Sequence, residues 1–96
     1  MKQTVATLEG MNELAAFLDA RISEDEKAAR VGNLPEEVWG ARGWYDPERV
    51  LAECRSKRRI MDYASAGLDE AEGLAVLRLV ALPWAGHSDF RAAWKA

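Results

Sequence analysis

The chain has 96 residues, enough for one domain and not for two, because a core that folds alone takes about 50 residues or more. Hydrophobic residues make up 49% and charged residues 30% of the sequence, which is typical of a globular protein rather than a disordered one. The net charge of −3 excludes a general electrostatic attraction to nucleic acid or to anionic membranes. Any such binding would need a local basic patch.

The cysteine content and the apolar stretches indicate where in the cell the protein resides. Cys54 is the single cysteine, so it has no partner for an internal disulfide. The N-terminal residues lack the pattern of a signal peptide, and the longest apolar stretch, Leu74–Trp84, is interrupted by Arg78. This stretch is also shorter than the roughly 20 residues that cross a bilayer. We therefore expect a cytoplasmic protein without a membrane partner.

The composition favours helix over sheet, since 17 Ala and 10 Leu outnumber 6 Val and 2 Ile. Residues 1–10 show no helical period and are predicted to form a flexible N-terminal arm, leaving residues 11–96 as one helical domain. The first helix is predicted over residues 13–30, with Asn12 as its N-cap. Its apolar side chains recur at three- and four-residue steps: Leu14, Phe17, Leu18 and Ile22.

A connection rich in Gly and Pro, residues 33–45, separates this helix from a second long one. Asp46 followed by Pro47 is a strong helix start, and Ala66–Gly67 marks the end. The residues expected to face the core are Val50, Leu51, Cys54, Met61 and Ala64.

Asp69 followed by Glu72 resembles a capping box and predicts a third helix start. The residues from Leu74 to Leu82 are apolar on nearly all sides, which favours a central helix with the others packed around it. Ser88 is predicted to cap a short C-terminal helix. The expected fold is all-α, a small bundle of three main helices with a short C-terminal helix.

Three blocks of sequence together resemble an uncharacterised family of short proteins from actinobacteria and their bacteriophages. The blocks are Asn12–Glu26, Asp46–Ile60 and Leu77–Trp94. The resemblance implies a bacterial cytoplasm and a phage or prophage context, and it implies no activity. Many relatives carry Cys and His between the second and third blocks, in an arrangement that suggests a metal site. Residues 61–73 here contain neither, so no metal is carried over.

No set of residues predicts an enzyme or a bound cofactor. His87 is the one histidine in the sequence. Two interpretations remain open: a structural residue in the turn after Pro83, or a catalytic base oriented by Asp89. Cys54 lies on an expected core face, which favours a buried hydrophobic role over a nucleophile. Zinc requires more ligands than these residues supply. We therefore expect a non-enzymatic protein.

A basic run on the second long helix is the first candidate for binding. Arg55, Arg58 and Arg59 are predicted to project away from the apolar face. Three readings remain open: pairing with the acidic first helix or with solvent, contact with an acidic protein, and phosphate contact in a nucleic acid. Because the segment 46–62 carries a net charge of only +1 and residues 9–30 carry −3, the sequence favours pairing inside the fold and disfavours nucleic acid.

Aromatic residues form the second candidate. Trp39 and Trp44 lie in the connection, whereas Trp84, Phe90 and Trp94 gather near the C-terminus. They either close the ends of the bundle as part of its core or form an exposed patch, and such patches mark protein interfaces. The sequence thus predicts binding of a protein partner, either a second copy or a host protein, through these aromatics beside the Arg-bearing helix. A nucleic-acid accessory protein using the basic run is the alternative.

Overall fold

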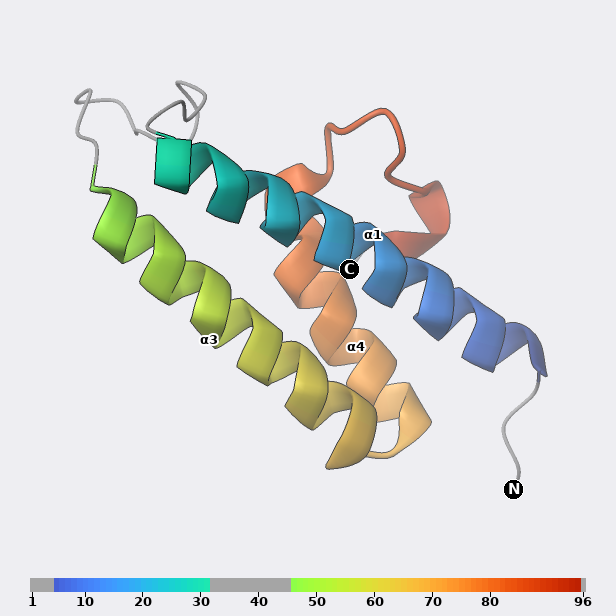
Figure 1. The fold of residues 1–96 in the computed structure, drawn as a ribbon. Helices are drawn as coiled ribbons and strands as arrows, with labels where there is room; N and C mark the ends of the chain where they lie inside the picture. The colour runs from blue at the N-terminus through green and yellow to red at the C-terminus, as the bar shows by residue number, and fades with distance from the viewer. Residues whose placement is uncertain (1–4, 32–45, 96) are drawn as a thin grey trace.

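The computed structural model describes residues 5–31 and 46–95 and shows three α-helices with two short 3₁₀ turns (Figure 1). Helix α1 spans Val5–Val31, α3 spans Pro47–Ala66 and α4 spans Glu70–Ala81. The 3₁₀ turns are η1, Leu82–Trp84, and η2, Ala92–Trp94. These ranges contain no strand, so the all-α prediction is confirmed. Trp39 and Trp44, with the rest of the predicted connection, lie outside the described residues.

Side-chain caps start two of the helices where the sequence predicts them. A carboxylate oxygen of Asp46 accepts a hydrogen bond from the backbone N–H of Arg49 at 3.1 Å. Asp69 accepts in the same way from the N–H of Glu72 at 2.8 Å, and this bond lowers the pKa of the Asp69 carboxyl. Each cap satisfies an amide that has no partner within the first turn of its helix.

Helix α1 begins earlier than predicted. It starts at Val5, so Asn12 lies inside the helix and is not its N-cap, and the predicted arm is helical from Val5 to Gly10. Gly10 does not interrupt the helix, because a glycine inside a helix costs only about 1 kcal/mol relative to alanine. Extending an existing helix requires no new nucleus, and Met11, which is 8% exposed, packs into the core just beyond the glycine.

The core lies between α1, α3 and α4. The apolar stripe predicted for α1 is confirmed, because Leu14, Leu18 and Ile22 are fully buried and Phe17 is 8% exposed. The other helices contribute their own buried side chains: Cys54, Ala64, Leu77 and Ala81. Helices α3 and α4 approach closely at Gly73, where an added Cβ would stand 2.3 Å from the carbonyl oxygen of Ala64.

Helix α4 is not the central helix that its sequence predicts. Helices α1 and α3 lie side by side, and α4 packs across one face of this pair (Figure 1). Only one side of α4 is fully buried, the side that carries Gly73, Leu77 and Ala81. Leu79 is 59% exposed and Leu82 is 44% exposed. Two neighbouring helices cover about half of a helix surface, so an apolar far side stays in solvent.

The C-terminal segment turns back onto α1 without the predicted helix. Residues 85–89 form turns, and η2 begins after Arg91 with no side-chain cap, so Ser88 is not an N-cap. Phe90 and Trp94 do lie together, with ring centroids 5.6 Å apart. Burial of Trp94 against Phe17, at 5.0 Å between centroids, fixes the path of this segment in place of a helix.

Candidate binding surfaces

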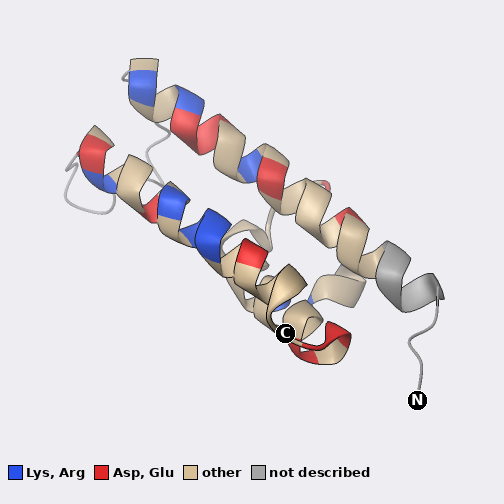
Figure 2. Ribbon diagram, turned by 60° about the horizontal axis from the view of Figure 1, so that its bottom comes forward, with Lys and Arg blue, Asp and Glu red and all other residues tan. Residues whose placement is uncertain are grey.

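Arg58 joins α3 to the acidic side of α1. Its guanidinium donates to both carboxylate oxygens of Glu26, at 2.9 and 3.0 Å, and to Asp19 at 2.6 Å. A further bond at 2.8 Å reaches the hydroxyl of Ser23. Figure 2 shows the basic stretch of α3 alongside the acidic stretch of α1. For Arg58 the structure therefore confirms pairing inside the fold, the reading that the sequence favours.

The Arg58–Glu26 pair should make stability depend on pH. The hydrogen bond from Arg58 holds the pKa of Glu26 below its ordinary value of 4.5. A carboxyl group whose pKa is lower in the folded than in the unfolded state stabilises the fold at pH values above its unfolded-state pKa. This contribution is lost as the pH falls through the folded-state pKa. We expect Glu26→Gln to cost about 1 kcal/mol near neutral pH. Urea unfolding across a pH series should show the cost shrinking as the pH falls below 4.5, the ordinary value for glutamate.

A matched control for this measurement is Glu48→Gln. Glu48 is an exposed residue in the first turn of α3 and makes no ion pair within the described part of the chain. Its substitution should change the free energy of unfolding by only a few tenths of a kcal/mol. Equal effects of the two substitutions at every pH would contradict a specific role for Glu26.

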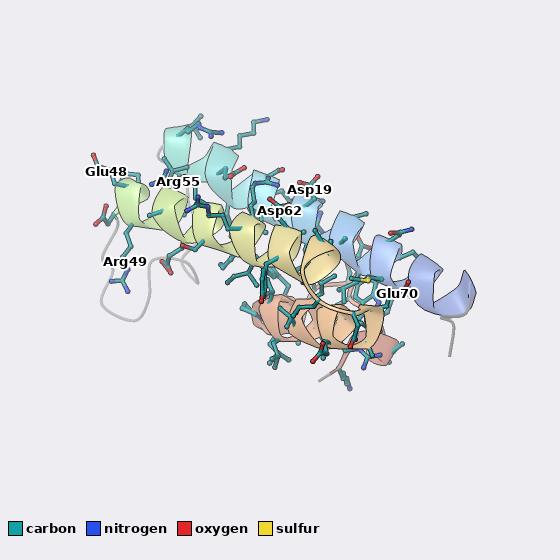
Figure 3. All side chains as sticks on the ribbon, turned by 90° about the horizontal axis from the view of Figure 1, so that it is seen from below. Asp19, Glu48, Arg49, Arg55, Asp62 and Glu70 are labelled. Carbon is teal, nitrogen blue, oxygen red and sulfur yellow. The ribbon has the colours of Figure 1, made fainter. Side chains whose placement is uncertain are left out.

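Arg55 and Arg59 differ from Arg58 in that both are exposed. Arg55 and Asp62 stand about one turn on either side of Arg58, and Figure 3 shows them on α3 with Asp19 on the neighbouring α1. The predicted basic run is therefore divided, because its central arginine is neutralised by α1. Arg55 and Arg59 remain exposed, one on each side of Arg58 in the sequence.

The C-terminal aromatics divide in a similar way. Trp94 is 6% exposed and belongs to the hydrophobic core, as expected if the aromatics close an end of the bundle. Phe90 and Trp84 are half-buried and pack against this core. The ammonium of Lys57 lies 5.0 Å from the ring centroid of Trp84, so the structure does bring this tryptophan beside the basic helix. An exposed aromatic patch centred on Trp94 is not formed.

His87 anchors the C-terminal turn to α1. A guanidinium nitrogen of Arg21 lies 2.8 Å from its Nε2, and its ring packs edge-on against Phe17 at 5.5 Å. Asp89 reaches the ring through its backbone N–H, 3.0 Å from Nδ1, while its carboxylate lies 3.8 Å from Arg21. The carboxylate-oriented base considered from the sequence is therefore not formed, because the carboxylate faces the arginine instead of the imidazole.

A pocket of about 700 Å³ lies between α1, α3 and the turn after η1. Burial raises the pKa of Asp25 at its wall, and the nearby ammonium of Lys57 partly opposes this shift. Burial likewise raises the pKa of the Cys54 thiol, which is 1% exposed and so remains a protonated core side chain. The remaining charged or aromatic lining residues are Arg21, Glu24, Glu53, Trp84 and His87. Two of these lining residues, Arg21 and Glu24, form an ion pair with each other.

Metal binding and membrane crossing find no support in the described residues. Within residues 5–31 and 46–95, no three His, Cys, Asp or Glu side chains are placed to hold a metal ion. In the same ranges, every helix is too short or too polar to pass through a bilayer.

A surface that the sequence missed lies on the solvent side of α4. Ala71, Ala75, Leu79 and Leu82 follow one another at four- and three-residue steps and are all exposed. We call these four residues the outer α4 face. Its signal was present in the sequence, since an apolar pattern on nearly all sides of a helix predicts two buried faces. The described part of the chain covers only one of them.

Comparison with known families places the chain without assigning it an activity. Residues 11–96 match the model of a protein family described as a family of unknown function (DUF6221). The chain belongs to this family. Membership confirms the predicted link to an uncharacterised family, whereas the actinobacterial and phage origin stays a prediction. No curated protein and no solved structure matches the chain.

Proposed function

We propose that this protein is a non-enzymatic protein-binding module and that the outer α4 face is its binding surface. The observation that carries the proposal is the exposure of two leucines, 59% for Leu79 near the end of α4 and 44% for Leu82 at the start of η1. The adjacent α3 exposes Ile60 by 43% and Tyr63 by 63%. Clustered exposed apolar side chains are typical of surfaces that bind another protein.

This surface replaces the aromatic cluster predicted from the sequence. Among the described residues, Trp94 is buried and Trp84 and Phe90 are each partly covered, whereas Leu79, Leu82, Ile60 and Tyr63 are exposed. Nucleic-acid binding, the alternative, gains no support, because Arg58 is held by two carboxylates of α1. The resemblance noted above extends the proposal to a partner in the cytoplasm of an actinobacterial host.

Site-specific photo-cross-linking in cells tests this function. A benzoylphenylalanine in place of Leu79 should form a covalent adduct with a protein, which mass spectrometry then identifies. The same probe in place of Val31 is the matched control, since Val31 is 66% exposed but lies at the far end of α1. An adduct from position 79 and none from position 31 supports the proposal. No adduct from position 79, or equal adducts from both positions, overturns it.

A further inference from the structure

The hairpin formed by α3 and α4 is acidic at its turn and basic farther along both helices. The turn carries three acidic residues within four positions: Asp69, Glu70 and Glu72. The basic residues are Arg55, Lys57 and Arg59 in the middle of α3 and Arg78 in the last turn of α4. Figure 2 shows the acidic turn separated from the basic stretch of α3. An antiparallel copy of the same hairpin would place each acidic turn beside the basic residues of the other.

Some of these charges have no ion-pair partner among the residues that the structure describes. Neither Arg59, Arg78 nor Glu72 takes part in an ion pair within the described residues. The Nε atom of Arg78 is buried and has no hydrogen-bond partner there. Complementary charge fixes the orientation of partners more than it adds affinity. The outer α4 face supplies the apolar contact, and the charges determine the direction in which the partner helix runs.

Ala75 occupies the centre of the outer α4 face. Ala71 and Leu79 stand four residues before and after it, about 6 Å along the helix axis in each direction. A small residue at the centre lets two helices approach closely. In an antiparallel pair the leucines of the two copies, Leu79 and Leu82, then lie on opposite sides of this centre. Figure 3 shows side chains of α4 projecting away from α1 and α3, on the side where a second helix would lie.

From these observations we infer that the partner on the outer α4 face is α4 of a second copy, in an antiparallel two-fold pair centred on Ala75. The same patch then meets itself, with Ala71 of each copy level with Leu79 of the other. This inference rests on the proposed function, because it names the protein that the surface binds. Helix α3 packs on the opposite side of α4, where Ala64 lies against Gly73, and it exposes Ile60 and Tyr63 of its own.

Molar mass in solution is the first test. Light scattering coupled to size-exclusion chromatography should give twice the chain mass of 10.7 kDa. Leu79→Glu should halve that mass while circular dichroism shows unchanged helix content, and Val31→Glu should leave the dimer intact. A wild-type chain that elutes as a monomer overturns the inference. The proposed function survives that outcome if position 79 still cross-links to a different protein.

Paired cysteines then test the orientation. In a Cys54→Ala background, Ala75→Cys should join to itself through a short bismaleimide linker. Ala71→Cys and Leu79→Cys proteins should each stay largely unlinked alone, and they should link to one another after the two are mixed and exchange subunits. Efficient linking of Ala71→Cys to itself would indicate parallel helices and overturn the inference.

Discussion

Replacement of Trp94 by alanine should lower the free energy of unfolding by about 3–5 kcal/mol, the usual cost of truncating a buried tryptophan. The indole is 6% exposed and its centroid lies 5.0 Å from that of Phe17 and 5.6 Å from that of Phe90. Its loss leaves a cavity between α1 and the C-terminal segment. Urea unfolding followed by circular dichroism measures this loss as a lower midpoint.

Trp84→Ala is the matched control for this measurement. Trp84 is half-buried and lies under the ammonium of Lys57, so its truncation removes less packing and should cost clearly less than Trp94→Ala. The comparison also matters for binding studies, because a partner lost by Trp94→Ala reflects unfolding unless stability is measured alongside. A Trp94→Ala protein as stable as the wild type would show that η2 does not pack on Phe17.

The second large effect is expected at Gly73. Gly73→Ala adds a Cβ that would stand 2.3 Å from the carbonyl oxygen of Ala64 and 2.8 Å from the terminal carbon of Met11. The methionine can move, but the backbone oxygen can yield only if α3 and α4 separate. Overpacking of this kind costs about 1–3 kcal/mol, and alanine regains about 1 kcal/mol of helix propensity. Because a backbone atom is in the way, we expect a net loss of about 2 kcal/mol.

Gly10→Ala provides the opposite expectation in the same assay. Gly10 also lies within a helix, but nothing stands within 4 Å of an added Cβ. The substitution should therefore raise the free energy of unfolding by about 0.5–1 kcal/mol. Stabilisation by both substitutions would mean that α3 and α4 do not meet at Gly73.

Local chemistry explains why much of the fold is predictable from the sequence. Asp46 and Asp69 cap their helices with side chains that reach amides only three residues away, so neighbours in sequence suffice to identify them. The stripe from Leu14 to Ile22 is equally local, because helical geometry alone brings residues three and four apart onto one face. Helix α1 began eight residues earlier than predicted because its start depends on the packing of Met11, which is not a local property.

The candidate binding surfaces depend on contacts between residues that are far apart in the sequence. A basic run looks the same in sequence whether it faces solvent or carboxylates, and only the packing of α3 on α1 brought Arg58 to Glu26, 32 residues away. Trp94 became a core residue because the chain folds back onto Phe17.

By itself, then, the sequence determined the helices, their caps and the apolar faces, which are set by interactions within a turn or two. The tertiary structure decided which of those faces are covered. Helices α1 and α3 bury one side of α4 and leave Leu79 and Leu82 in solvent, because two neighbours cannot enclose a third helix. Burial is a property of the whole arrangement, and so is the surface on which the proposed function depends.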